Sequence, residues 1–289
     1  MAATCDITVR FHEPPADLAP FFTTFYRADF HVPDGPVSDA LQPEWGGVRM
    51  FSGTPPRATI GDCAVISSDI QAQGPTTQPI VFEMANCSLW GFGLLPLGWA
   101  TFMGVPAHDY ANRIFDGRTE PAFARFAPLA DRLTADIAHQ DAEYRAIVDF
   151  FRSEIECHTA DRDRILSIHQ MLLDPDVTDV ASMAVSAGLS QRTLERVSLR
   201  AFGFPPKQLL RRQRFMRSLA QFMIDPSKGW LNAMDETYFD QSQFVRDCHD
   251  FLGMAPTDYA AINHPVMSAF MRERMKALGS PVQTLDQPG

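Results

Sequence analysis

Two eight-residue stretches, LSQRTLER at residues 189–196 and FDQSQFVR at residues 239–246, repeat one pattern at an offset of 50 residues. Ser190 and Asp240 are residue types that cap the N-terminus of a helix, and a glycine further along each copy is the usual left-handed stop. A proline then stands where a new helix would begin. The glycines and prolines are Gly203, Pro206, Gly253 and Pro256. The repeat therefore predicts two capped, glycine-terminated helices.

The residues around the repeat complete a helix-turn-helix pattern. Residues 180–187 predict a short helix that ends at Gly188, three residues before the first capped helix begins. Residues 207–223 contain no Gly or Pro and predict a linker helix about 26 Å long. Such a linker would hold two recognition helices near one turn of DNA apart, roughly 34 Å. The alternative is a helical bundle whose charged residues are merely solvated.

Charge is unevenly distributed along the chain, which has a formal net charge of -10 and a pI near 5.2. Residues 1–160 carry 10 Arg, no Lys and 20 acidic residues, whereas residues 161–289 carry 15 basic and 15 acidic ones. Within residues 190–217, eight basic residues accompany a single acid, Glu195, which gives a local charge of +7. Contact with DNA phosphates needs a basic surface of this kind. The acidic whole-chain charge therefore does not exclude a nucleic-acid binder.

The cysteines and the N-terminus favour a reducing compartment. The five cysteines have wide, irregular spacing without a C-x-x-C pair, which argues against a disulfide framework and against a zinc–cysteine site. The first residues lack a charged start followed by an apolar run, so we expect a cytoplasmic protein. Residues 84–108 contain no Asp, Glu, Lys or Arg, but their glycines and prolines favour buried strands and turns over a membrane span.

The first 158 residues are expected to form a β-rich domain. Short apolar pieces at residues 7–11, 48–51, 64–67, 80–84 and 89–95, separated by Pro and Gly, predict strands, and residues 17–25 predict a helix near the start. Fourteen of the 22 Phe and three of the four Trp lie in residues 1–160. This concentration indicates either an aromatic-lined pocket or an ordinary aromatic core.

Residues 121–157 predict a helical extension of that domain, because their apolar residues recur at spacings of three, four or seven. The stripe either covers the β-rich domain or pairs with its copy in a homodimer. A polar cluster nearby is expected to be a solvated helix face, and the dispersed histidines predict no metal site. The stripe is Phe126, Leu129, Leu133, Ile137, Tyr144, Val148, Phe151 and Ile155, and the cluster is Asp136, His139, Asp141 and Glu143. A hinge is expected at residues 157–162.

Residues 163–262 resemble the DNA-binding region of AraC/XylS-type transcriptional regulators, in which a linker helix joins two helix-turn-helix modules. The resemblance rests on the repeat and on its ending, D-Q-S-x-F-x-R-x6-G-x2-P-x2-Y at residues 240–259. It implies a first module at about residues 178–203, a linker helix at 206–224 and a second module at about 228–253. These would lie within a DNA-binding domain at 161–278, followed by a flexible tail at 279–289.

The same resemblance implies which side chains contact DNA. In the first module they are Arg192, Glu195 and Arg196, with Arg200 beside them, and in the second they are Gln241, Ser242 and Arg246. Arginine can bond guanine through two hydrogen bonds, glutamine can bond adenine, and glutamate can accept from cytosine. The alternative for each position is a solvated surface residue.

The second module departs from the family pattern. Thr237 stands where the family usually has glycine, and Ser198 and Cys248 stand where it has an aromatic residue. The second module also carries six acidic residues against two basic ones, Lys228 and Arg246. Carboxylates repel phosphate, so we predict that the first module supplies most of the DNA affinity.

The N-terminal half resembles the β-rich sensor domain that precedes this DNA-binding region in some family members. The matching pieces are residues 11–14, 21–26, 91–99 and 104–107. The resemblance implies a cupin-like domain for effector binding or dimerisation. The expected fold class is α+β, with a β-rich N-terminal domain that ends in helices and an all-α C-terminal domain.

The sequence therefore predicts a sequence-specific transcription regulator that binds double-stranded DNA. We expect a homodimer modulated by a small organic effector, which as an activator would also contact RNA polymerase. No catalytic residue, cofactor or membrane partner is expected, since the G-x-S-x-G, P-loop, G-x-G-x-x-G and H-E-x-x-H patterns are absent. Two other classes stay open. One is a protein-interaction module with a degenerate helix-turn-helix, and the other is an enzyme with a nucleic-acid-targeting tail.

Overall fold

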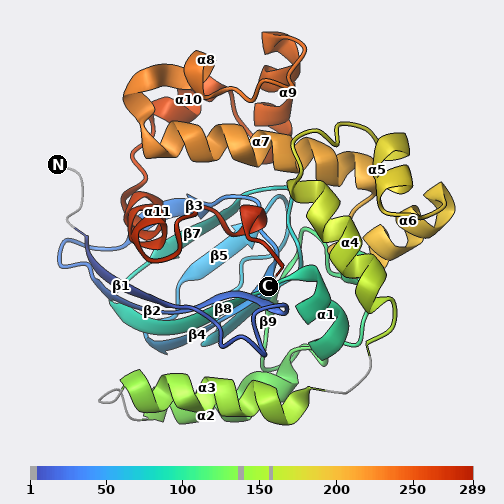
Figure 1. Cartoon of the computed structure of the whole chain (residues 1–289). Coiled ribbons are helices and arrows are strands. Elements are labelled where there is room, and N and C mark those ends of the chain that lie inside the picture. Colours follow the sequence, from blue (N-terminus) through green and yellow to red (C-terminus); the bar gives the residue numbers. More distant parts are fainter. Residues whose placement is uncertain (1–4, 136–139, 156–158, 289) are drawn as a thin grey trace.

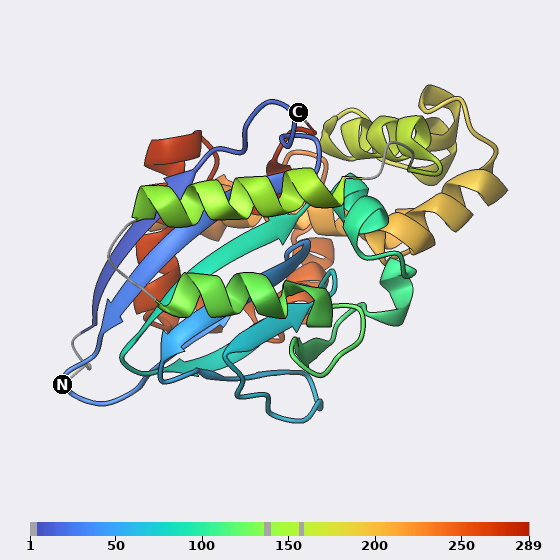
Figure 2. The ribbon, with the colours of Figure 1, turned by 90° about the horizontal axis from the view of Figure 1, so that it is seen from below.

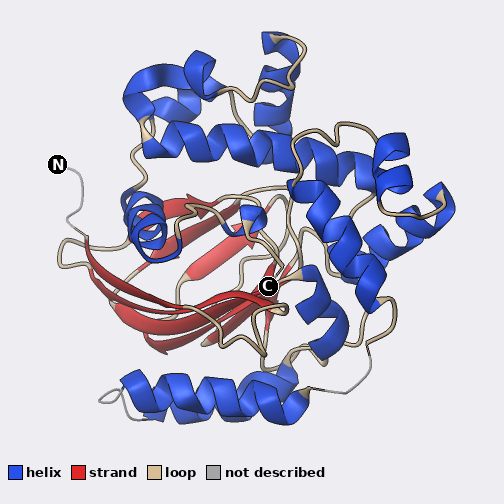
Figure 3. Ribbon diagram, viewed as in Figure 1, coloured by secondary structure: helices blue, strands red, loops and turns tan. Residues whose placement is uncertain are grey.

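The computed structural model describes residues 5–135, 140–155 and 159–288. Strands fill the first 116 residues of this part, and helices make up most of the remainder (Figures 1 and 3). This arrangement confirms the α+β fold class, with a β-rich N-terminal region followed by helices that include both predicted helix-turn-helix modules.

The strands form two antiparallel sheets. The six-stranded sheet has the order β1-β2-β8-β4-β6-β9, and the three-stranded sheet has the order β3-β7-β5. The strands are β1 (Asp6–His12), β2 (Phe22–His31), β3 (Val37–Leu41), β4 (Gly46–Gly53), β5 (Arg57–Ile60), β6 (Ile70–Gln73), β7 (Ile80–Met84), β8 (Cys87–Leu94) and β9 (Ile114–Asp116).

The outer face of the six-stranded sheet packs against helices α2 (Ala127–Ala135) and α3 (Gln140–Glu154), which lie side by side across it (Figure 2). Pairing of β2 with β8 and of β8 with β4 places Phe25, Phe92 and Val48 in one row on this face. Leu129 and Phe151 of the two helices pack on that row in one buried cluster. The apolar stripe thus covers the sheet, as in the first of the two arrangements that the sequence allowed.

The inner face of the six-stranded sheet and the three-stranded sheet enclose a second cluster. Because successive side chains of a strand alternate between faces, Tyr26 and Phe51 point inward beside Phe82 of β7. Helix α11 (Pro265–Leu278) packs on β1 and β3 and adds Val266 and Phe270 to this cluster. The sheets and α11 therefore form a barrel-like body with an apolar interior (Figure 1).

The helices of the C-terminal half follow the repeat. They are α4 (Arg162–Leu173), α5 (Val180–Ser186), α6 (Gln191–Val197), the π-helical turn η3 (Ser198–Phe202), α7 (Pro206–Ile224), η4 (Pro226–Lys228), α8 (Gly229–Ala233), α9 (Gln241–Leu252) and α10 (Pro256–Ala261). The remaining short elements are α1 (Pro96–Phe102), η1 (Ala107–Asp109), η2 (Ala124–Phe126) and η5 (Gln283–Leu285). None of the described helices is long and apolar enough to cross a membrane.

Two predicted helix-turn-helix modules pack differently. Leu194 and Phe202 of the first module belong to the same buried cluster as Phe25 and Phe92 of the sheet. The second module has a cluster of its own, in which Phe244 and Phe251 of α9 pack on Phe215 of α7. The first module is therefore continuous with the core of the N-terminal half, and α7 carries the second module.

Two expectations from the N-terminal half were wrong. Residues 17–25 form no helix but turn into β2, because residues 22–25 bury side chains on both faces of the sheet. An apolar run this short is compatible with either structure. Residues 64–67 form only an isolated bridge, between Ile66 and Ala58.

Part of the predicted polar face is buried. Glu143 is 6% exposed, and its Oε2 accepts hydrogen bonds from Trp90 Nε1 (2.6 Å) and from Arg27 Nη1 (3.2 Å). Asp141 is exposed as expected, whereas Asp136 and His139 lie outside the described residues. Glu143 therefore fastens α3 to the sheet instead of facing solvent.

The chain from residue 279 onward, expected to be a flexible tail, is docked. It includes η5, and Thr284 within it is fully buried. Long-range hydrogen bonds that composition does not reveal hold it in place, and they are described below.

Candidate DNA interface and interior pocket

The predicted helix caps of the first module are present. Asp179 Oδ1 accepts hydrogen bonds from the backbone N–H groups of Ser182 (2.9 Å) and Ala181 (2.8 Å), and these bonds hold the pKa of its carboxyl below the usual range. Gly188 then takes φ +65°, a left-handed conformation that glycine adopts without strain, and it turns the chain toward α6. Ser190 Oγ accepts from the backbone N–H of Thr193 (3.2 Å) and starts α6.

The side chains predicted to contact DNA in the first module lie on its outer surface. Arg192, Glu195, Arg196 and Arg200 are all exposed, while Leu194 is fully buried and anchors α6. Among the described residues, Arg192 and Arg200 take part in no ion pair. The exposed surface of this module therefore offers cations that are not already neutralised.

Arg196 differs because it has an internal partner. Its Nη1 lies 3.0 Å from Oδ2 of Asp161, which precedes α4 in a left-handed conformation with φ +61°. The hydrogen bond from Arg196 is the largest cause that lowers the pKa of Asp161, and Arg164 adds to it. Arg196 would have to share or exchange this carboxylate in order to reach a base or a phosphate.

The second module is capped in the same way and more completely. Asp240 Oδ1 accepts from the backbone N–H of Gln243 (2.7 Å), while Gln243 Oε1 accepts from the backbone N–H of Phe239 (3.1 Å). This reciprocal pair is a capping box. Gln241, Ser242 and Arg246 are exposed, and α9 ends at Gly253, whose φ is +74°.

Thr237 fills the turn position where the family has glycine. Its backbone N–H and its hydroxyl both donate to Oδ1 of Asp235, with the backbone bond at 3.0 Å. These bonds form the turn without a left-handed residue, so the departure from the pattern leaves the turn intact. Two residues later Phe239 is 91% exposed directly before the recognition helix, a feature that the sequence did not reveal.

The acidic residues of the second module mostly face inward, onto α7. Asp247 is 1% exposed and accepts from Arg211 (Nε at 3.0 Å, Nη2 at 2.6 Å), from Arg214 Nη2 (3.0 Å) and from Tyr238 Oη (2.9 Å). Asp250 is a second partner of Arg211.

Asp235 continues this pairing at the other end of the module, with Arg217 Nε at 2.5 Å from its Oδ2. The carboxylates that suggested repulsion of DNA are thus partners of linker arginines. Arg211, Arg214 and Arg217 are in turn not free for phosphate. The difference between the modules now rests on unpaired cations. Arg192, Arg200 and Lys207 form no ion pair among the described residues of the first module, and Arg246 alone is comparable in the second.

Helix α7 is also fixed to the N-terminal half. Arg212 is fully buried, its guanidinium carbon lies 3.9 Å from the ring centroid of Trp45, and its Nη1 donates to the carbonyl oxygen of Thr76 (3.1 Å). Burial lowers the pKa of Arg212 to about 9, so its guanidinium stays charged at neutral pH. Gln208 donates to Thr77 Oγ1 (3.2 Å) one turn earlier. The linker helix therefore connects the barrel to both modules.

The start of α11 is held by the barrel as well. Asp39 of β3 accepts from the backbone N–H groups of Val266 and Met267, both at 2.9 Å, and from His264 Nδ1 at 3.0 Å. Gln42 donates to Tyr259 Oη of α10 (2.8 Å). The segment that follows the second module is thus locked onto the mouth of the barrel.

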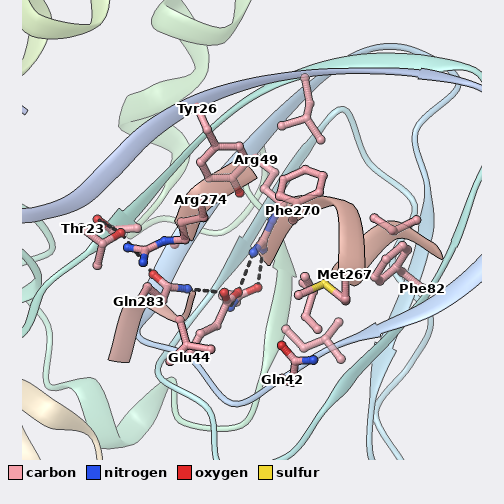
Figure 4. A pocket seen from close by; sticks show the side chains of 18 of the residues that line it. Thr23, Tyr26, Gln42, Glu44, Arg49, Phe82, Met267, Phe270, Arg274 and Gln283 are labelled. Atoms are coloured by element: carbon pink, nitrogen blue, oxygen red, sulfur yellow. Dashed lines mark hydrogen bonds and ion pairs between the residues drawn. The ribbon is translucent and has the colours of Figure 1, made fainter. Parts of the chain in front are cut away.

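An interior pocket lies between the two sheets and α11 (Figure 4). Its apolar end is lined by Phe51, Phe82, Met84, Met267 and Phe270. Its polar end contains Arg49, whose Nη2 lies 2.5 Å from Glu44 Oε1 and whose Nη1 donates to Gln73 Oε1 (2.7 Å). An apolar chamber with a few convergent polar groups is typical of small-molecule sites.

The aromatic residues of the N-terminal half therefore serve both purposes that the sequence left open, core and pocket. Among the described residues no group of three or more His, Cys, Asp or Glu side chains could hold a metal ion.

Comparisons with known proteins agree with this architecture. The family described as "Helix-turn-helix domain" matches residues 183–262, which run from α5 to the residue after α10. No curated protein matches the chain.

Several solved structures are similar to most of it. ToxT from Vibrio cholerae, in a 1.65 Å structure, is 12% identical, with a TM-score of 0.44 and coverage of 89% of this chain and 98% of ToxT. ToxT of strain SCE256 bound to an unsaturated fatty acid is 9% identical, with a TM-score of 0.44 and coverage of 89% and 94%. The AraC-like transcriptional activator CuxR is 14% identical, with a TM-score of 0.30 and coverage of 74% and 87%. The resemblance to AraC-type regulators is thus confirmed for the C-terminal half, and residues 183–262 belong to the helix-turn-helix domain family.

Proposed function

We propose that this chain is a sequence-specific regulator of transcription that binds double-stranded DNA through both recognition helices, α6 and α9. One observation carries the proposal: two helices start with the same side-chain cap, bury the same inward position and expose the polar residues of their first two turns. In a helix-turn-helix module, these N-terminal residues of the second helix meet the base edges in the major groove.

The exposed side chains have the chemistry for both kinds of contact. Arg192, Arg196 and Gln241 stand near the helix starts, where base edges would be read. Arg200 and Arg246, further along each helix, suit phosphate contacts, which position a protein on DNA without specifying sequence. Glu195 and Ser242 complete the exposed surfaces as hydrogen-bonding groups. The three unpaired cations of the first module support a larger electrostatic contribution from that module.

The interior pocket supports regulation by a small organic effector with an apolar body and a polar end. An effector can shift a population only by its differential affinity for two arrangements of the protein. The pocket is built partly from β-strands and partly from α11, which follows the second module, so its occupancy has a route to the DNA-binding half. Assembly as a homodimer and contact with RNA polymerase as an activator are further parts of this proposal.

The test is a titration of purified protein with a duplex chosen by selection, at several salt concentrations. Arg192→Ala and Arg246→Ala should each weaken binding and make the dependence of affinity on salt less steep, by about one unit of log–log slope for a lost phosphate contact. Arg192→Ala should cost more.

The matched control is Arg57→Ala, which removes an exposed arginine from β5 of the barrel. This variant should bind like the unmodified protein. If no duplex binds in a salt-dependent manner, the proposal fails and a protein-interaction module becomes the better account. Equal losses for Arg192→Ala and Arg57→Ala would exclude α6 as a DNA-reading helix.

A further inference from the structure

The segment of residues 280–288, here called the C-terminal strap, closes one side of the interior pocket. Pro281, Val282 and Gln283 line the pocket together with Arg274 of α11. Arg274 holds both ends of the strap, because it donates to the carbonyl oxygen of Ser280 (2.6 Å) and forms an ion pair with Asp286. The strap therefore has a defined position on the pocket instead of extending into solvent.

Gln283 points from the strap into the polar end of the pocket (Figure 4). Its Nε2 donates to Glu44 Oε2, and its Oε1 accepts from Thr23 Oγ1 (3.2 Å). A carboxylate acceptor and a hydroxyl donor on the barrel wall thus bind the two ends of one carboxamide group. This is how a site would hold the carboxamide of a ligand, with each polar atom matched to its own partner.

The barrel wall has space for this group only because residue 93 is glycine. Successive positions of β8 alternate between the two faces, and Gly91 and Gly93 both lie on the inner one. A Cβ added at Gly93 would collide with Gln283 Oε1 and with Thr23 Oγ1. The carboxamide therefore occupies a recess that any other residue at this position would fill.

The strap also touches the linker helix. Gln213 of α7 is fully buried, and its Nε2 donates to the carbonyl oxygen of Thr284 (2.7 Å), the residue after Gln283. Val282 packs in the same cluster as Phe215 and Met216 of α7. The next residue of the helix, on the side of its N-terminus, is Arg212, which sits over Trp45, the neighbour of Glu44. The pocket's polar end and the linker helix are thus connected through the strap.

We propose that Gln283 is an internal ligand of the pocket, and that an effector with a primary carboxamide or an equivalent donor–acceptor group on an apolar body binds by displacing it. Displacement separates Thr284 from Gln213 and so loosens the hold of the N-terminal half on the linker helix. This proposal rests on the effector site proposed above and specifies its ligand class and its means of regulation.

The first experiment needs no ligand. Amide hydrogen exchange is compared for the full chain, for Gln283→Ala and for the matched control Gln287→Ala, which changes an exposed glutamine of the same strap. Gln283→Ala should speed exchange in residues 280–288 and around Gln213 in α7 at least several-fold, whereas Gln287→Ala should leave both unchanged. Equal exchange in all three proteins would overturn the proposal.

The second experiment measures the affinity of a defined probe, 3-phenylpropanamide, by calorimetry. Gln283→Ala vacates the recess and should bind the probe about tenfold more tightly than the unmodified chain, since one or two hydrogen bonds no longer have to be exchanged. Gly93→Ala also releases the strap but fills the recess, so it should accelerate exchange without gaining affinity.

The acid analogue, 3-phenylpropanoate, should bind Gln283→Ala more weakly than the amide, because its carboxylate would face Glu44. Absence of amide binding to Gln283→Ala, or identical affinities in Gln283→Ala and the unmodified chain, would overturn the ligand class. Failure of the proposed function is recognised separately: the chain would then fail to bind any DNA duplex, while the exchange and calorimetry results would stand unchanged.

Discussion

Asp247→Asn should destabilise the second module substantially, because this carboxylate is the common partner of two linker arginines. Asp247 is 1% exposed, and it accepts two hydrogen bonds from Arg211, one from Arg214 and one from Tyr238. Removing one member of a buried ion pair typically costs about 3–5 kcal/mol. Arg211 is 36% exposed and keeps Asp250, so we expect the low end of that range, about 2–3 kcal/mol.

The loss is measured by urea unfolding followed by far-UV circular dichroism, with hydrogen exchange in α9 to locate it. Asp250→Asn is the matched control, since it lies on the same helix and also pairs with Arg211 but is 54% exposed. Its cost should stay within about 1 kcal/mol, the usual worth of an exposed pair. Equal losses for the two variants, or no loss for Asp247→Asn, would refute the view that Asp247 joins α9 to α7.

Two further predictions concern the contacts that fix the C-terminal half. Burial raises the pKa of Asp286 to about 6 from 3.8, so the folded chain holds a proton that the unfolded chain releases between about pH 4 and pH 6. Stability should therefore fall as pH rises through that window, and thermal unfolding in a buffer series should show that Asp286→Asn removes this fall; the same pH profile in both proteins would contradict it. Trp45→Leu leaves the buried Arg212 cation without its aromatic face and should cost about 3–5 kcal/mol in urea unfolding. The cost should shrink when Arg212→Met is present as well, and strict additivity would contradict the pairing.

Local features of the C-terminal half were predictable from sequence because each is encoded within one or two helical turns. The caps at Ser190 and Asp240, the stop at Gly203 and the helix start at Pro206 all appear where the repeat predicted them. The interactions that determine these features span only a few residues. Their physical causes are therefore visible in a short window of sequence.

The pairing of charges was not predictable in the same way. Counting charges in residues 190–217 and in the second module gave two opposite surfaces, but Arg211 and Asp247 are 36 residues apart in sequence and join in the folded chain. A charge count cannot distinguish an arginine that faces solvent from one that pairs internally.

The pocket and the strap depend on contacts that are longer still. Gln283 and Glu44 are 239 residues apart in sequence, and nothing in the composition of the C-terminal residues indicates that they are docked. Gly91 and Gly93 in β8 were the available signal, because glycine inside a strand often marks a close approach by another group. In this chain those groups are Tyr26 and Gln283.

Selection from a pool of random duplex DNA with the purified chain tests the central claim most directly, that α6 and α9 read sequence in the major groove. The account predicts two enriched boxes separated by about one helical turn, roughly 10–10.5 base pairs centre to centre. It also predicts that Arg192→Ala relaxes the preference in one box and Gln241→Ala in the other. A pool that stays random, or a single box that neither substitution changes, would contradict it.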